Sequence, residues 1–444
     1  MKREEMRREI RLCLRDDVRL LPAVLAVIEK SALSFGLGES GALALTLAGE
    51  EIFNYLCATV RPQAEIEICC RDGGYRTILD FSLPLREFSL KSFNLTASVN
   101  LEDEQSLEEM GLVIASRMVD SLELVASSPG RLRLILSKEK SYPEAGGSGP
   151  AATGFGPEFT VVVPDDEELK YFLEALNRSL TPGRLAPELR FPGKLIDMIR
   201  CGERQAALVR DRRQRFGGAI IWFWSSDRMV ECQGPLLLPG GEAGERRRWA
   251  AALLDKCLHA IARTAAVGLV CRSFDPELAG EYFEPLGSLY DCGAAGAARE
   301  LRAGFRQLRE DPGAVIWCHS ALQGELKERC RRLALPREIR TIGDSGETRE
   351  EFSVLASDFD RSRSLVTLRP LWAGADLAEN LARHLALFAA EGIPNILFRL
   401  DLGQSWMAAL APALLSNGFT PRLLLPYGGR QGDLLIFQKL DGVQ

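Results

Sequence analysis

An acid and an amide lie one helical turn apart in the segment LTLAGEEIFNYL, residues 45–56. Glu50 and Asn54 have this spacing, which places both side chains on the same face of the expected helix. A carboxylate there can orient or activate a nucleophile, and an amide oxygen is a suitable ligand for magnesium. The alternative interpretation is that Glu50 and Glu51 form an acidic, solvent-facing pair beside the apolar residues of this helix.

Glycine-rich segments at two other places could hold an anion. Residues 239–244 (PGGEAG) precede a long helix expected over residues 243–264, and three arginines, Arg246, Arg247 and Arg248, follow them. Glycines allow backbone amides to approach a phosphate, and a helix N-terminus attracts negative charge. The alternative is that the arginines form a solvent-exposed basic face on the first turn. Residues 372–376 (WAGAD) form a similar segment with a single glycine, Gly374, and an acid, Asp376.

The length and local composition divide the chain into three parts. A chain of 444 residues corresponds to about three domains at roughly 150 residues each. Residues 141–157 (SYPEAGGSGPAATGFGP) are rich in Gly, Pro, Ser and Ala, which predicts a flexible linker. A second seam lies near residues 287–296. We therefore predict a first domain (1–140), a linker (141–157), a second domain (158–292) and a third domain (293–444).

The first domain combines helical and strand patterns without strict alternation. Ile10, Leu12 and Leu14 alternate with polar residues, as in a half-buried strand. Helices are expected over residues 18–32, 40–58 and 112–122, and further strands over residues 64–70, 75–82 and 131–138. This order predicts an α/β sandwich, in which helices cover one face of a mixed or antiparallel sheet.

Residues of about 8–140 resemble the ATP-binding fold of histidine kinases and of anti-sigma-factor serine kinases, the GHKL ATPases. Residues 45–56 resemble the family's N-box, residues 80–84 (DFSLP) its D-x-G-x-P box, and residues 109–112 (EMGL) its G-x-G-L box. The resemblance implies a function for four residues: Glu50 is the catalytic acid, Asn54 binds nucleotide and magnesium, Asp80 binds the adenine amino group, and Gly111 lies at the phosphates. A shifted alignment would make Glu51 the acid and put Tyr55 at the amide position.

Two departures from that family weaken the expected chemistry. Ser82 replaces the glycine of the second box, and Glu108 and Glu109 put negative charge where the triphosphate would lie. One such charge about 4 Å away costs about 4 kcal/mol at an effective dielectric constant of about 20. Backbone hydrogen bonds, at about 1 kcal/mol each, do not offset this. We therefore predict weak or absent kinase activity, with any ATP and magnesium acting as a conformational switch.

The second and third domains resemble the GNAT superfamily of acetyltransferases. Residues 158–290 follow that fold's order: a strand, two helices, a three-stranded meander, a long helix, a strand, a helix and a strand. The third domain resembles a second copy, most clearly in residues 408–439, which predict a helix, a Gly-Phe turn and a terminal hairpin. The predicted fold class is thus α/β, with an ATPase-like sandwich followed by two GNAT-like domains.

This second resemblance implies sites for acetyl-CoA. The superfamily binds the cofactor's pyrophosphate in an R/Q-x-x-G-x-G/A loop, so the candidate CoA-binding residues are Gly241, Gly244, Arg246 and Gly374. The leading Arg or Gln is absent from the second domain. The tyrosine that often protonates the leaving thiolate is also missing, since the corresponding positions hold Phe283 and Leu414, with Tyr282 one residue away. These departures indicate that at most one copy is active.

Composition excludes several other functions. Acids outnumber Lys and Arg by 61 to 55, which disfavours a general nucleic-acid or membrane-surface protein. The 11 cysteines include no C-x-x-C pair, and the N-terminus lacks a signal peptide, so we expect a cytoplasmic protein with reduced thiols. The three histidines lack zinc-binding spacings, and no structural metal is expected. Trp222, Phe223 and Trp224 alternate on a strand, where they could serve either the core or a substrate wall.

Three functional hypotheses follow. The first is a bacterial regulatory protein of the partner-switching type, whose first domain binds a sigma factor or an anti-sigma antagonist. The second is a GNAT N-acetyltransferase that uses acetyl-CoA and is regulated by the first domain. The third is a non-catalytic scaffold. The sequence leaves the partner, the acetyl acceptor and the oligomeric state open.

Overall fold

The computed structural model describes residues 8–59, 65–84, 94, 114–115, 117–128, 131–146, 155–156, 158–179, 185–292, 298–342, 351–360 and 364–440. These residues belong to two compact units. Unit 1 consists of residues 1–141, 348–358 and 368–391, and unit 2 consists of residues 142–347, 359–367 and 392–444. In the described part of the chain, no helix combines the length and the apolar character needed to cross a membrane.

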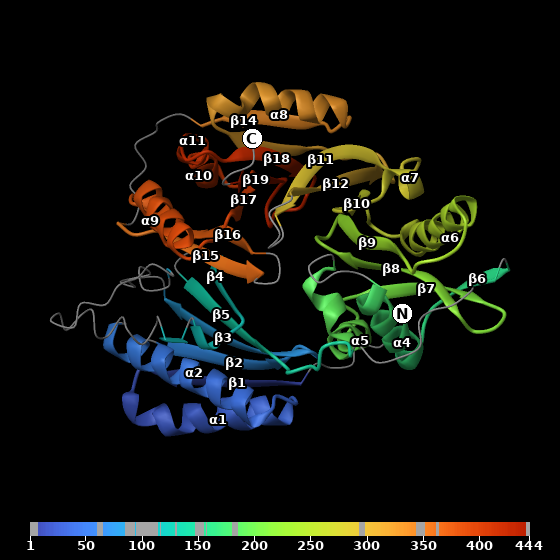
Figure 1. Ribbon diagram of the computed structural model, residues 1–444. Helices are drawn as coiled ribbons and strands as arrows, with labels where there is room; N and C mark the ends of the chain where they lie inside the picture. Colours follow the sequence, from blue (N-terminus) through green and yellow to red (C-terminus); the bar gives the residue numbers. More distant parts are fainter. Residues whose placement is uncertain are drawn as a thin grey trace. The chain divides into compact units, whose positions relative to one another are not determined.

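Unit 1 contains an antiparallel five-stranded sheet with two long helices on one face (Figure 1). The helices are α1 (Leu21–Ser34), which follows the short η1 (Val18–Leu20), and α2 (Glu39–Thr59). The strands lie in the order β1 (Glu9–Arg15), β2 (Glu65–Asp72), β3 (Arg76–Pro84), β5 (Arg131–Glu139) and β4 (Ser121–Ser128). The predicted sheet with one helical face is therefore present.

Alternation along the strands decides which face the helices cover. Leu79, Phe81 and Leu83 of β3 lie in one buried cluster with residues of α1 and α2, so the intervening residues of β3 point to the opposite face. Gly49 allows the two helices to approach, because a Cβ atom there would lie 2.5 Å from Cδ1 of Ile28. Of the predicted helix over residues 112–122, residues 114–115 and 117–118 are helical and residues 112, 113 and 116 lie outside the described part of the chain, while the last two residues begin the strand β4.

The second domain forms a seven-stranded sheet in unit 2 with helices on both faces (Figure 1). Its strands occur in the order β11 (Glu284–Cys292), β12 (Ala298–Gln307), β10 (Gly268–Cys271), β9 (Met229–Leu237), β8 (Phe216–Trp224), β7 (Gln205–Asp211) and β6 (Phe159–Val162). The helices are α4 (Asp166–Ser179), η3 (Pro187–Arg190), α5 (Pro192–Arg200), α6 (Ala243–Ile261) and α7 (Pro276–Ala279).

Two separate apolar clusters hold these layers together. Ala207, Ile220 and Trp222 pack with Trp249 and Leu253 of α6 on one face. On the other face, alternate residues of the same strands pack against α4, η3 and α5. The element order predicted from the GNAT resemblance is present up to β11. The structure adds β12, which inserts between β10 and β11 and extends this sheet to Gln307, beyond the expected boundary at residue 292.

The third domain begins with a parallel pair, β13 (Ala314–Cys318) and β14 (Arg337–Thr341), connected by α8 (Ser320–Arg332). A five-stranded sheet follows in the order β15 (Val354–Asp360), β16 (Leu365–Trp372), β17 (Asn395–Asp401), β19 (Leu434–Leu440) and β18 (Thr420–Leu425). Its helices are α9 (Leu377–Ala390), α10 (Ser405–Ala408) and α11 (Ala411–Ser416). The predicted terminal hairpin is the antiparallel pair β18–β19.

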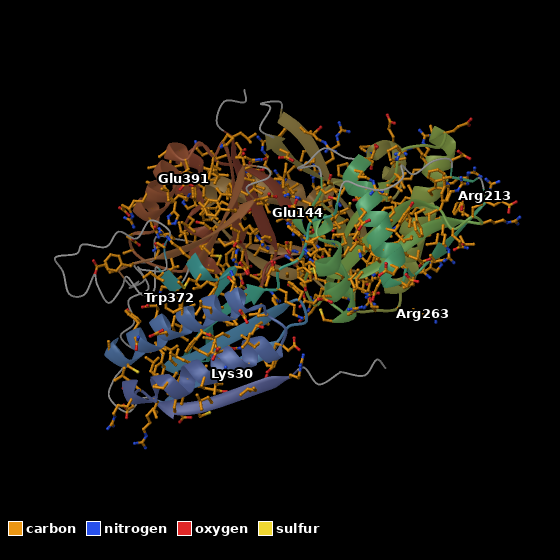
Figure 2. The ribbon with its side chains drawn as sticks, turned by 60° about the horizontal axis from the view of Figure 1, so that its bottom comes forward. Lys30, Glu144, Arg213, Arg263, Trp372 and Glu391 are labelled. Atoms are coloured by element: carbon orange, nitrogen blue, oxygen red, sulfur yellow. The ribbon has the colours of Figure 1, made fainter. Side chains whose placement is uncertain are left out.

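The start of the predicted linker is attached to the second domain. The hydroxyl of Tyr142 donates to Asp197 Oδ2 at 2.7 Å, and Glu144 forms an ion pair with Arg190 at 2.6 Å. Residues 147–154 and 157 lie outside the described part of the chain. At the opposite end of the second domain, Figure 2 shows Arg213 in the turn between β7 and β8, where Arg212 and Arg213 are exposed.

Candidate functional site

Strands β9 and β10 form the one parallel pair in the second domain's sheet among the residues described, and their pairing is short. It runs from Met229 opposite Gly268 to Cys232 opposite Cys271, where β10 ends while β9 continues to Leu237. The register between β8 and β9 shifts directly after this point, so β9 contains a bulge at residues 234–235. The sheet is therefore opened at the carboxyl end of β10.

Gly234 makes the bulge possible. Its φ angle is 107°, and a Cβ atom there would lie 2.7 Å from the backbone nitrogen of Leu236. Both observations require glycine, because a side chain would be strained in this conformation and would collide with the chain. The carbonyl of Gly234 accepts a hydrogen bond from Sγ of Cys271, at 3.4 Å, which ties the bulge to the end of β10.

A pocket of about 440 Å³ lies at this opening; we call it the β9–β10 pocket. A volume of this size is suited to a small molecule. Its wall is formed by η3, by strands β8, β9, β11 and β12 and by residues of the third domain, all within unit 2. Its polar lining includes Glu188, Glu231, Gln233, Arg272, Asp291, Arg299, Asn395 and Gln438.

Glu231 is the buried carboxylate at the centre of the opening. Its neighbours in β9, Val230 and Cys232, pack beneath α6, so Glu231 points to the opposite face of the sheet, where the pocket lies. It is 7% exposed, and Oε2 forms an ion pair with Arg272 Nη2 at 2.8 Å. Oε1 makes no hydrogen bond with any residue that the structure describes. One carboxylate oxygen is thus held in place, and the other can receive a proton.

A second set of polar contacts fixes the wall on the η3 side. Nε2 of Gln233 donates to Oε1 of Glu188 at 2.6 Å, and the guanidinium of Arg204 stacks over the ring of Phe223 at 3.6 Å. Phe223 therefore forms part of the wall, while Trp222 lies in the core under α6. From the sequence, the aromatic cluster at residues 222–224 could belong either to the core or to a substrate wall. In the structure Trp222 belongs to the core and Phe223 to the pocket wall.

The third domain closes the pocket through two buried amides. Asn395 of β17 and Gln438 of β19 hydrogen-bond to each other at 2.8 Å, and both donate to the carbonyl of Tyr290 in β11, at 2.8 and 2.7 Å. Gln438 Oε1 also accepts from the amide of Tyr290 at 3.0 Å. These side chains replace the hydrogen bonds of a neighbouring strand, so the third domain forms a fixed wall of the pocket.

The glycine loop before α6 can accept a phosphate. Gly240 and Gly244 face open space, and the amides of Ala243 and Gly244 make no hydrogen bond with a described residue. Gly241 has a φ angle of 76° and packs against Trp249, where a Cβ atom would lie 2.4 Å from the ring. The backbone of residues 240–244 therefore leaves open space and two amides that are available to an anion.

The side chains around this loop carry both signs of charge. Arg246 donates to the carbonyls of Leu238 and Gly240, at 2.9 and 3.2 Å, and so supports the loop, while Arg247 and Arg248 are exposed. Glu245 Oε2 accepts from the amide of Glu242 at 3.0 Å. The arginines favour a bound diphosphate, and the carboxylate of Glu242 at the helix N-terminus opposes it.

The corresponding loop of the third domain is filled. A Cβ atom on Gly374 would lie 2.2 Å from the backbone of Phe352 and Ser353, so these residues occupy the space in front of the glycine. The side chain of Asp376, the residue directly before α9, accepts a hydrogen bond from the amide of Ser353 at 2.6 Å. Gly374 thus packs against the protein's own chain, and this loop does not fit a CoA pyrophosphate.

The nucleotide candidates of the first domain are not brought together. Glu50 and Asn54 are half-buried on α2. Asp80 lies on the sheet face opposite α1 and α2, where it forms ion pairs with Arg71 at 3.1 Å and with Arg133. Gly111 lies outside the described residues. Among the residues described, no three His, Cys, Asp or Glu side chains are grouped to hold a metal ion.

Tyr282, the tyrosine nearest the expected acid position, is engaged elsewhere. Its hydroxyl donates to Asp255 of α6 at 3.0 Å, and burial together with this carboxylate raises the pKa of Tyr282 to about 12. Phe283 and Leu414, at the positions where the GNAT resemblance would place a tyrosine, are both buried. No acid for the leaving group is therefore assigned from these residues.

Comparisons with known proteins give a partial picture. No family profile and no curated protein sequence matches the chain. Among solved structures, a chimeric spermidine N-acetyltransferase from Vibrio cholerae is similar at 16% identity and a TM-score of 0.27, covering 34% of this chain and 95% of its own. An acetyltransferase of the GNAT family from Staphylococcus aureus is similar at 13% identity and a TM-score of 0.26, covering 34% of this chain and 100% of its own.

These similarities concern part of the chain and name no activity for it. The chain's own elements, β6 to β11 with α4 to α7, have the order expected of an acetyltransferase-like domain. The chain is therefore a mixed α/β protein, and its residues 159–292 have the element order predicted from the sequence.

The pocket residues themselves were missed from the sequence. Glu231 and Gln233 alternate with Val230 and Cys232 in the segment MVECQG, and a carboxylate within such an apolar strand is the signal that could have identified them. The sequence around Arg272 and Asp291 does not distinguish them in this way. Arg272 directly follows an apolar strand and Asp291 lies near the end of another, as many surface residues do.

Proposed function

We propose that the second domain transfers an acyl group from a thioester to an amine bound in the β9–β10 pocket. The observation that carries this proposal is the buried carboxylate of Glu231 at the point where β9 and β10 separate, next to a small-molecule pocket. An amine needs to lose a proton before it can attack a carbonyl carbon, and a positioned carboxylate can accept that proton.

Each residue has a distinct task in this proposal. Glu231 accepts the proton of the bound ammonium group at Oε1, while Arg272 holds Oε2 and fixes the orientation of the carboxylate. Gln233, anchored by Glu188, and the aromatic wall at Phe223 position the acceptor. Burial of these groups excludes water, which strengthens their interaction with a charged ligand.

The loop at residues 240–244 and the arginines that follow it would hold the pyrophosphate of acyl-CoA. When bound, acyl-CoA supplies the acyl group as a thioester, whose C–S bond breaks as the new N–C bond forms. The ammonium group loses two protons in the net reaction: Glu231 accepts one and releases it to solvent, and the other ends on the departing sulfur. Positioning the amine beside the thioester supplies much of the rate increase, so the reaction does not require the missing tyrosine.

The proposal is tested with the full chain, acetyl-CoA and a panel of acceptors that includes the standard amino acids, spermidine and an aminoglycoside. Release of free thiol and a mass increase of one acetyl group on the acceptor are measured together. Glu231→Gln keeps the shape of the side chain but removes the base, and we expect it to lower the transfer rate at neutral pH by about 10²-fold or more.

Glu167→Gln provides a matched control, because Glu167 lies exposed on α4 and outside the pocket lining. Glu231→Asp retains a carboxylate and should restore part of the rate, which separates a catalytic from a structural effect. The proposal is wrong if the wild-type chain acetylates no acceptor in the panel, or if Glu231→Gln is as active as the wild type.

Regulation by the first domain remains a prediction from the sequence. Binding of a sigma factor or an anti-sigma antagonist, and of ATP with magnesium, is tested by pull-down with such partners and by thermal shift with ATP-magnesium. The separation of Asp80 from Glu50 and Asn54 by the sheet gives no support to the nucleotide site.

A further inference from the structure

The β9–β10 pocket is lined by groups of both charge types, which distinguishes it from a site for a simple polyamine or a simple anion. Three acids, Glu188, Glu231 and Asp291, and two arginines, Arg272 and Arg299, line it. A ligand that fits such a wall has to present a positive and a negative group together.

The two arginines are suited to a carboxylate. Arg299 makes no ion pair or hydrogen bond with any described residue, although Asp291 lies directly opposite it on the neighbouring strand. Arg272 uses Nη2 for Glu231, and its buried Nε is left without a hydrogen-bond partner among the residues described. A buried donor without a partner costs about 1–3 kcal/mol. A ligand carboxylate can satisfy both guanidinium groups, because their planar donors match its two oxygens.

The groups on β9 are suited to an ammonium group. The amide nitrogen of Gln233 is held by Glu188, and its buried oxygen Oε1 lacks a hydrogen-bond partner in the described part of the chain. Oε1 of Glu231, two residues earlier on the same face of β9, is also available. Two acceptors on one face of a strand provide a place for a donor that carries positive charge.

The remaining wall is apolar and of limited extent. Leucine side chains from four strands line it, namely Leu289, Leu301, Leu365 and Leu397. Together with a volume of about 440 Å³, this surface is suited to an aliphatic side chain rather than to a sugar or a polypeptide.

From this combination we infer that the acceptor is a free α-amino acid with an aliphatic side chain, bound as a zwitterion. Its carboxylate pairs with Arg299 and Arg272, its ammonium group contacts Gln233 and Glu231, and its side chain lies against the leucines. The inference rests on the proposed function, since it names the acceptor class of the same pocket.

The test measures binding to the full chain by calorimetry without any CoA, using three ligands of the same carbon skeleton. These are leucine, 3-methylbutylamine, which lacks the carboxylate, and 4-methylpentanoate, which lacks the amine. We expect leucine to bind at least about 10-fold more tightly than either analogue, because each analogue leaves either the two arginines or the two acceptors on β9 without a ligand partner. Arg299→Gln should weaken leucine binding about 10-fold and leave the affinity for the amine unchanged.

Arg302→Gln is the matched control, because Arg302 lies on the same strand, is exposed and pairs with Glu300. It should bind all three ligands as the wild type does. The inference is overturned if the amine binds as tightly as leucine, if none of the three ligands binds, or if Arg299→Gln has no effect. Leucine binding without acetyl transfer would refute the proposed function alone, and acetylation of spermidine without leucine discrimination would refute this inference alone.

Discussion

The sequence predicts a phosphate-binding loop before both α6 and α9, but the structure packs the two loops differently. At α6, Gly240 and Gly244 face open space and two helix amides are without partners among the described residues. At α9, Gly374 is pressed against the chain at residues 352–353. The first loop can receive a ligand, whereas the second is part of the protein interior.

Buried polar residues lie both behind the start of α9 and in the β9–β10 pocket. Behind the start of α9, Asn380 donates to Asn94 Oδ1 at 2.9 Å and to Ser353 Oγ at 3.0 Å, and all three residues are buried. In the β9–β10 pocket, Gln233 Oε1 and Arg272 Nε lack partners among the residues described. The α9 network also retains two unpaired buried atoms, Asn380 Oδ1 and His384 Nε2. The difference between the two helix starts therefore rests on the space in front of their glycines.

The largest expected effect comes from adding a methyl group at each loop. Gly374→Ala would put a Cβ atom 2.2 Å from backbone atoms that cannot rotate away, so the chain has to shift. We expect the free energy of unfolding to fall by about 3 kcal/mol or more. Gly244→Ala meets open space near the start of α6 and should raise this free energy by up to about 1 kcal/mol.

Urea denaturation followed by circular dichroism measures both variants, and each serves as the control for the other. If both substitutions changed the free energy of unfolding equally, the two loops would not differ in packing. The sequence alone predicts this equality, because it places both glycines in a phosphate loop.

The sequence predicted those elements whose pattern is local. The alternation of Ile10, Leu12 and Leu14 identified β1, and the helical spacing of residues 40–58 identified α2 within one residue at each end. The strand β12 was missed because its segment ARELRAGFRQ is rich in charge and follows a glycine-rich seam that resembles a domain boundary. Its alternating Leu301, Ala303 and Phe305 were the available signal.

The site was harder to predict, because its residues meet only in the folded chain. Glu231, Arg272 and Asn395 are separated by 41 and 123 positions along the sequence (272 − 231 and 395 − 272). The same limit applies to Gly374, whose sequence context resembles a phosphate loop and whose packing partner at residues 352–353 is visible only in three dimensions.

A second prediction concerns pH and the buried network of α9. Burial lowers the pKa of His384, whose Nδ1 lies 2.9 Å from the carbonyl oxygen of Asn380. In the unfolded chain this imidazole has its ordinary pKa of about 6.5. Above that pH both states are neutral and the stability is complete. Below it the unfolded state gains a proton first, so the stability falls by up to about 1.4 kcal/mol per pH unit until the folded pKa is reached.

The measurement is the urea midpoint between pH 7 and pH 5. We expect His384→Gln to flatten this dependence, and His259→Gln, which changes an exposed histidine of α6, to retain it. An unchanged slope in His384→Gln would mean that α9 does not depend on a neutral, buried imidazole.

The smallest expected effect tests the electrostatics of the α6 loop directly. Glu242 is exposed at the helix N-terminus, where its carboxylate opposes a bound diphosphate. Removing one surface charge there changes the interaction by about 0.3–1 kcal/mol, so Glu242→Gln should tighten the binding of CoA about 2- to 5-fold at low salt. Glu310→Gln removes an equal charge from an exposed position elsewhere and should leave the affinity unchanged. Asp376→Asn, at the start of α9, should likewise have no effect on CoA binding, because the protein's own chain fills the space at that loop. Tighter CoA binding in this variant would place the cofactor at α9 in the third domain instead of at α6.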